Sequence, residues 1–168
     1  MTQTEIESKA TFRGTEYDDS LGNGYNTNDI FDGGLGNDTL YGGEGSDTYL
    51  FDIGDGQDTI SDYGYDGETD IIIFDKIVAK DTIAFFRDGS DLHITYGDAD
   101  RIAVFNQDTS GIEKMQINEG PFLTDGDINT LIQQMTAYAA DRGISMTTVD
   151  DVKKNQELMG MVMNAWHQ

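Results

Sequence analysis

Two nine-residue segments, GGLGNDTLY at 33–41 and GGEGSDTYL at 42–50, follow each other without a gap and decide the fold. Both fit the pattern G-G-x-G-x-D-x-U-x, in which U is a large apolar residue. The preceding segment 24–32 keeps the first glycine, the aspartate and the apolar position. Segments 14–22 and 54–60 are further degenerate copies with small offsets, so the chain holds two exact and three degenerate repeats.

Each repeat combines a tight loop with a minimal strand. The six residues G-G-x-G-x-D form the loop, because glycine adopts positive φ and lets backbone carbonyls point inward. The three residues x-U-x form a strand that sends U into a shared core. Two units make one turn, so loops about 18 residues apart stack on one side. A cation between stacked loops meets only carbonyl and carboxylate oxygens, a donor set that selects Ca²⁺ over zinc or copper.

Charge is distributed unevenly along the 168 residues. The chain carries 32 acidic and 10 basic side chains, a formal net charge of −22. Between Gly14 and Asp75 there are 13 Asp and 3 Glu but no Lys or Arg. Such a surface repels nucleic acid and anionic lipid, which argues against both as partners. Cysteine is absent and His93 and His167 are the only imidazoles, so disulfides and thiolate or multi-histidine metal sites are not expected.

The nonapeptides resemble those of the RTX family, secreted proteins whose glycine-aspartate repeats form a Ca²⁺-loaded parallel β-roll. The resemblance implies that loop carbonyls and aspartate carboxylates bind the ions, and that Asp38 and Asp47 each bridge two of them. In the loop of Asp29, Tyr25 and Thr27 stand where the exact repeats have glycine. The implied metal ligands are Asp19, Gly24, Asn26, Asp29, Gly33, Gly34, Leu35, Gly36, Asp38, Gly42, Gly43, Glu44, Gly45, Asp47, Gly54, Gly56 and Asp58. Asp62 and Asp66 lie past the repeats and are expected to contribute much less.

Downstream of the repeats the composition changes to apolar runs with mixed charges. Strands are expected at 71–74, 83–86, 92–96, 102–105 and 112–117. Asp88-Gly89 is a tight-turn signal, so the second and third of these strands form a β-hairpin. His93 alternates with apolar neighbours, which places it on the opposite, solvated face.

The last forty residues show helical spacing. Ile128, Leu131, Ile132, Met135 and Ala139 recur at the period of an amphipathic helix. Asp125 or Asp127 is its expected N-cap and Gly143 its end. A second helix is expected from Thr147 or Thr148 to about Trp166. Its methionine-rich surface either packs on the strands or contacts a partner, since methionine side chains adapt to varied surfaces.

The predicted fold is mainly β: a Ca²⁺-loaded parallel β-roll followed by a β-rich capping region with two C-terminal helices. We divide the chain into the roll at 14–60, the cap at 61–124 and a helical segment at 125–168. The downstream part is also similar to the segment after the last repeat block of large RTX toxins and adhesins, adenylate cyclase toxins among them. That similarity implies a C-terminal signal for a type I secretion machine, located at 125–168.

These features predict a calcium-binding module of a larger secreted toxin or adhesin that folds on Ca²⁺ outside a Gram-negative cell. No cleavable signal peptide is visible, and no apolar run reaches the ~18 residues that span a bilayer. The sequence lacks H-E-x-x-H, G-x-S-x-G and P-loop motifs, so we predict no enzymatic activity. The expected partners are Ca²⁺, the secretion machine and upstream parts of the same polypeptide. The alternative is an adhesin module that binds a glycan or protein and uses its Ca²⁺ structurally.

Overall fold

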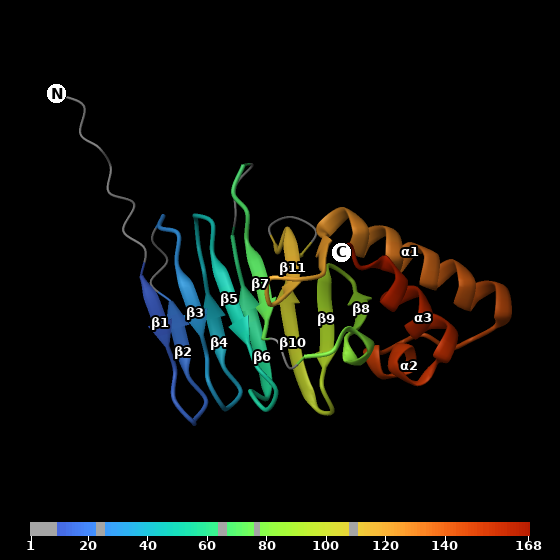
Figure 1. Cartoon of the computed structure of the whole chain (residues 1–168), viewed down its shortest axis with the longest axis horizontal. Helices are drawn as coiled ribbons and strands as arrows, with labels where there is room; N and C mark the ends of the chain where they lie inside the picture. Colours follow the sequence, from blue (N-terminus) through green and yellow to red (C-terminus); the bar gives the residue numbers. More distant parts are fainter. Residues whose placement is uncertain (1–9, 23–25, 64–66, 76–77, 108–110) are drawn as a thin grey trace.

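From residue 11 to residue 74 the chain winds so that successive short strands enter two facing sheets in turn (Figure 1). The computed structural model describes residues 10–22, 26–63, 67–75, 78–107 and 111–168. In this part of the chain, sheet 1 has the order β1-β3-β5-β7-β11-β12 and sheet 2 the order β2-β4-β6-β10-β9-β8. The strands are β1 Thr11–Arg13, β2 Ser20–Gly22, β3 Ile30–Asp32, β4 Thr39–Tyr41, β5 Thr48–Phe51, β6 Gln57–Ser61, β7 Ile71–Phe74, β8 Ala84–Asp88, β9 Asp91–Tyr96, β10 Asp100–Phe105, β11 Lys114–Ile117 and β12 Phe122–Thr124. This arrangement confirms the predicted parallel roll followed by a β-rich cap.

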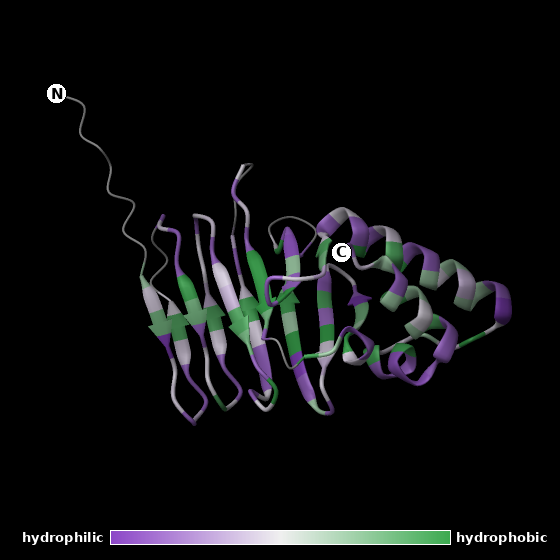
Figure 2. Cartoon of the chain, viewed as in Figure 1, coloured by the Kyte–Doolittle hydropathy of each residue, from purple (hydrophilic) through white to green (hydrophobic). Residues whose placement is uncertain are grey.

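The apolar U positions of the repeats stack in register from turn to turn. In sheet 1, Phe12 pairs with Phe31 and Phe31 with Tyr49. The three rings also stack, with centroids 5.0 and 5.2 Å apart. In sheet 2 the corresponding column begins with Leu21, Leu40 and Ile60. Figure 2 shows hydrophobic residues along the strands and hydrophilic ones in many of the loops. A three-residue strand buries little by itself, so each turn depends on its neighbours.

Both sheets continue across residue 60 into strands that carry no glycine loops. β10 pairs in parallel with β6, and β11 pairs in parallel with β7. Only then do antiparallel strands follow: β9 and β8 extend sheet 2, and β12 ends sheet 1. The hairpin expected around Asp88-Gly89 is therefore confirmed, whereas β12 was not expected. The boundary between roll and cap at residue 60 remains a prediction. Both hydrogen-bonded sheets continue across it.

Three helices lie at the end of the roll opposite β1 (Figure 1). α1 spans Asp125–Arg142, α2 Val149–Lys154 and α3 Gln156–Ala165, and a short 3-10 helix, η1, spans Lys80–Thr82. The N-cap of α1 is Thr124 rather than an aspartate, because Asp127 takes the third position of a capping box. The predicted end at Gly143 is confirmed by its left-handed backbone, φ 63°.

The helix expected from Thr147 or Thr148 to Trp166 is interrupted at Asn155. The Asn155 side chain accepts hydrogen bonds from the backbone N–H groups of Glu157 and Leu158, which begins α3 as a separate helix. Leu158 and Val162 are buried by this packing, while Met163 is exposed. His93 faces outward from β9 as predicted but is half-buried, beside Val149 of α2. No helix in the described residues is apolar over a length that could cross a membrane.

Candidate metal centre

The loops gather along two opposite edges of the roll (Figure 1). Loops 26–29 and 42–47, together with residues 62–63 and 67–70, lead into sheet 1 and form the sheet-1 row. Loops 14–19, 33–38 and 52–56 lead into sheet 2 and form the sheet-2 row. In the exact repeats, the glycines at the second and fourth positions have positive φ, such as Gly34 at 83° and Gly45 at 120°. Those positions require glycine because a side chain is strained there.

Aspartates at the ends of the loops form hydrogen-bonded ladders along both rows. In the sheet-1 row, the backbone N–H of Asp29 donates to Asp47 Oδ1 and that of Asp47 donates to Asp70 Oδ1, each at 2.7 Å. The N–H of Asp70 donates in turn to Glu113 Oε2 at 2.7 Å. The sequence separations are 18, 23 and 43 residues, so the stacking survives where the predicted spacing of 18 does not. The 43-residue interval contains β7, η1, β8, β9 and β10, yet β7 and β11 still pair in register.

The sheet-2 row repeats the same arrangement. The N–H of Asp19 donates to Asp38 Oδ1 at 2.8 Å, and the N–H of Asp38 donates to Asp58 Oδ1 at 2.9 Å. Each aspartate thus uses one carboxylate oxygen to bind the backbone of the preceding turn. The ladder leaves the second carboxylate oxygen of each aspartate available for another donor or for a cation.

Four of these second oxygens are buried and have no hydrogen-bond partner among the described residues. They are the Oδ2 atoms of Asp38, Asp47, Asp58 and Asp70. A buried carboxylate oxygen without a partner is costly, and a bound cation removes that cost. Burial raises the pKa of Asp47 and Asp58 to about 7 and that of Asp70 to about 8, and it also raises the pKa of Asp38. These oxygens fit Ca²⁺, a hard cation that binds carboxylates.

The first glycine of each exact repeat leaves room for the free oxygen of its own loop. A Cβ added at Gly33 would lie 2.3 Å from Asp38 Oδ2. A Cβ added at Gly42 would lie 2.4 Å from Asp47 Oδ2. At these two positions the glycine is required for space rather than for backbone conformation.

The first turn differs, because threonine hydroxyls donate hydrogen bonds to the corresponding Oδ2 atoms. Asp19 Oδ2 accepts hydrogen bonds from the Thr15 N–H at 2.7 Å and from its hydroxyl at 2.8 Å. Asp29 Oδ2 accepts one from the Thr27 hydroxyl at 2.8 Å. The protein itself therefore satisfies both carboxylates, and their predicted role as metal ligands remains a prediction.

The remaining predicted ligands lie in the same loops. Leu35 and Glu44 are the third residues of the exact repeats, and Glu44 accepts a hydrogen bond from Asn26 at 2.8 Å. The backbone N–H groups of Gly54 and Gly56 donate to the Asp100 carboxylate. Gly24 lies outside the described residues. The ligand roles of these residues remain predictions.

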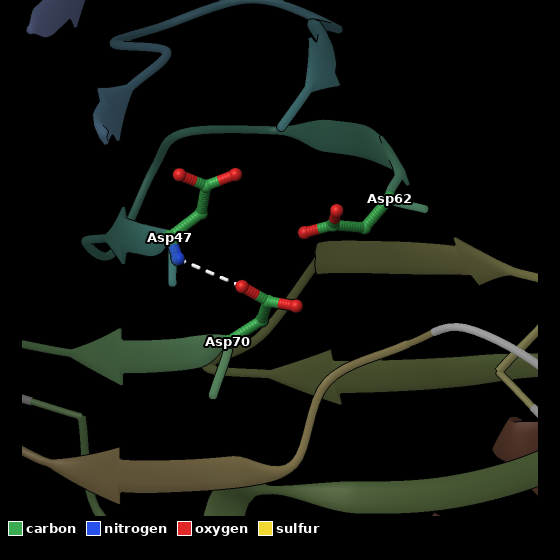
Figure 3. A group of neighbouring side chains, drawn as sticks. All are labelled: Asp47, Asp62 and Asp70. Atoms are coloured by element: carbon green, nitrogen blue, oxygen red, sulfur yellow. Dashed lines mark hydrogen bonds between the residues drawn. The ribbon is translucent and has the colours of Figure 1, made fainter. Parts of the chain in front are cut away.

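Three acidic residues outside the predicted ligand set also lie in the sheet-1 row: Asp62, Asp70 and Glu113. Asp62 was expected to matter little, but it is buried and its carboxylate lies with those of Asp47 and Asp70, all within 4.8 Å of one another (Figure 3). Asp66 falls outside the described residues. Asp70 and Glu113 continue the sheet-1 ladder without a glycine loop. A local signal did exist, because Asp70 precedes the buried Ile72 as Asp47 precedes Tyr49, with one residue between.

Residues 23–60 match the RTX calcium-binding nonapeptide repeat in four copies. The chain is also 36% identical over 97 residues to the iron-regulated protein FrpA of Neisseria meningitidis serogroup C. That match covers 53% of the chain and 9% of FrpA, so the chain spans about a tenth of the length of this relative. Together with the ladders, these similarities identify an RTX block in the chain, and Ca²⁺ is the ion of such repeats. The chain therefore contains a block of RTX calcium-binding repeats.

Proposed function

We propose that this module folds only when Ca²⁺ is bound and that it is part of a larger secreted toxin or adhesin. The observation that carries the proposal is the set of four buried, unpartnered carboxylate oxygens on Asp38, Asp47, Asp58 and Asp70. Folding without an ion would bury them as two like-charged pairs, Asp38 with Asp58 and Asp47 with Asp70, in a segment that has no lysine or arginine from residue 14 to 75. Ca²⁺ neutralises the carboxylates and links the turns, so metal-binding free energy becomes folding free energy.

The cap is proposed to nucleate the roll. Its strands β10 and β11 extend both sheets in parallel, so β6 and β7 gain paired backbones and a covered core on the side away from the repeats. Repeats of three-residue strands gain stability mainly from such neighbours. Extracellular Ca²⁺ levels would then trigger folding only after export.

Export through a type I machine, directed by a signal in residues 125–168, is the second part of the proposal. It is supported by the RTX repeats, which are characteristic of secreted proteins. We propose a binding and folding role without catalysis, since the acidic residues with raised pKa values in the ladders are accounted for as ion ligands.

Circular dichroism in the far ultraviolet tests the first part. We expect the β signal of the full chain to be lost in EDTA and restored by Ca²⁺, with a midpoint on the order of 10⁻⁴–10⁻³ M, as in extracellular modules. Mg²⁺ at equal concentration should be far less effective, because it gives up its bound water reluctantly. Identical spectra in EDTA and in millimolar Ca²⁺ would refute the proposal. Fusing residues 125–168 to a cytosolic reporter in cells with a type I machine tests export.

A further inference from the structure

We infer that Asp47, Asp62 and Asp70 form a separate Ca²⁺ site that is completed by residues outside the nonapeptides. The inference rests on the proposed function, since it assigns one more ion to the same roll. It differs from the repeat sites in its ligands. Two of its three carboxylates come from the segment between β6 and β7, which lacks the G-G-x-G loop.

The three carboxylates have the spacing that one ion requires. Asp47 ends the loop before β5, Asp62 follows β6 directly, and Asp70 precedes β7. One oxygen of each lies within 4.8 Å of the others. Two oxygens on opposite sides of a single Ca²⁺, each at 2.3–2.6 Å, are at most about 5 Å apart, so a shared ion can contact all three. Figure 3 shows the three side chains surrounding a common space, with the Asp47 N–H bound to Asp70.

Unpartnered oxygens supply independent evidence for a ligand there. The Oδ2 atoms of Asp47 and Asp70 have no hydrogen-bond partner among the described residues, and both residues are 0% exposed. Their Oδ1 atoms are already used by the ladder, which fixes the orientation of both carboxylates. Two fixed, buried and unpartnered anionic oxygens beside a third carboxylate are strongly stabilised by a bound cation.

Tyr49 acts as a positioning residue for the third carboxylate. Its hydroxyl donates to Asp62 Oδ2 at 2.5 Å, and the Tyr63 N–H donates to Asp62 Oδ1 at 2.7 Å. Tyr49 is itself fixed by its stacking on Phe31. A donor of this kind orients a metal-binding carboxylate from the second coordination shell.

Gly42 keeps the space open. A Cβ at this position would lie 2.1 Å from the Tyr49 hydroxyl, 2.4 Å from Asp47 Oδ2 and 2.7 Å from Asp62 Oδ2. All three atoms therefore converge on the backbone of one residue, and only glycine allows this. An ion here would join the last exact repeat to β7, which pairs with the cap strand β11.

The test is a comparison of full-length chains in saturating Ca²⁺, with bound ions counted by equilibrium dialysis. Asp62→Asn should lose one ion, or bind it at least about tenfold more weakly, while Asp88→Asn, in the exposed hairpin turn, should keep every ion. Tb³⁺ provides a second readout, because tyrosine close to the ion transfers excitation to it. Tyr49→Phe should lower this sensitised emission, and Tyr17→Phe, a 70% exposed tyrosine of the other row, should not.

The outcomes separate this site from the proposed function. If the wild-type chain folds with Ca²⁺ but Asp62→Asn keeps its full ion count and Tyr49→Phe its full emission, the site is refuted and the proposed function stands. If the wild-type chain binds no ion at all, the proposed function fails. If Asp62→Asn does not fold, Tyr49→Phe, which removes only a hydroxyl, decides through its emission.

Discussion

The first turn of the roll and the later turns differ in what contacts the second carboxylate oxygen of each loop-end aspartate. In the first turn, Thr15 and Thr27 donate hydroxyls to the second oxygens of Asp19 and Asp29. In the later turns, glycines stand where the first turn has these threonines, Gly34 for Thr15 and Gly45 for Thr27, and the corresponding oxygens of Asp38 and Asp47 are buried without a partner among the described residues. The backbone ladder is the same in both regions. A hydroxyl satisfies one carboxylate locally, whereas an ion satisfies a carboxylate and also links two loops.

We predict that the repeat turns, including the first turn with Thr15 and Thr27, do not fold without the cap. Deleting Lys76–Gln168 removes β10 and β11, the strands that cover the last turn. We expect the remaining chain to stay disordered in millimolar Ca²⁺, because short strands without neighbours do not offset the entropy of ordering. Circular dichroism measures this directly. A truncated chain with the Ca²⁺ midpoint of the full chain would show that the cap is not the nucleus.

Ligand substitutions sharpen the difference between the two regions. Asp38→Asn and Asp47→Asn should each raise the Ca²⁺ midpoint of folding by about tenfold or more, because each removes charge from a buried free oxygen. Asp19→Asn should shift it much less, since Thr15 already satisfies that carboxylate. Calcium titrations followed by circular dichroism provide the comparison. Equal shifts in all three variants would indicate diffuse counterion binding rather than defined sites.

The later turns should also make the metal-free fold sensitive to pH. Burial raises the pKa of Asp47 and Asp58 to about 7 and that of Asp70 to about 8, above the ordinary value of 3.8. A raised folded-state pKa means that the stability is present below pH 4 and is lost as pH rises through 7–8. In EDTA, we therefore expect some β structure near pH 4 and none at pH 8.

Protons and Ca²⁺ then compete for the same oxygens, so the Ca²⁺ midpoint should fall as pH rises between 5 and 8. Binding measured by calorimetry in buffers of different ionisation enthalpy should show proton release. A midpoint that does not change with pH over this range would contradict the assignment of these carboxylates as ligands.

The smallest effect is expected from restoring glycine in the first turn. Thr27→Gly frees Asp29 Oδ2, and we expect the folded chain to bind one additional ion with a small change in the overall midpoint, less than about threefold. Thr27→Ser keeps the hydroxyl and serves as the matched control, with no additional ion. Equilibrium dialysis counts the ions. If both variants bind as many ions as the wild type, the hydroxyl is not what excludes the metal.

Much of this molecule follows from the local sequence. The order of glycine, aspartate and apolar residue in 33–41 and 42–50 determines the loop, the three-residue strand and the choice of Ca²⁺, because these depend on backbone freedom and donor type within nine residues. Helix spacing likewise located α1 and its end at Gly143. The sequence did not predict that Thr124 is the N-cap of α1 or that the next helix is interrupted at Asn155, since several polar residues nearby are equally suited to an N-cap position.

The tertiary structure alone decided which acidic residues share a site. Asp70 and Glu113 continue the sheet-1 ladder over a separation of 43 residues, and Asp62 meets Asp47 across a turn of different length. Parallel pairing is made by backbone groups that every residue carries, so no local pattern specifies a partner that far away. The sequence by itself determined that the chain binds Ca²⁺ through stacked loops. Only the packing of the turns decided where a free carboxylate oxygen remains for an ion and where a threonine takes its place.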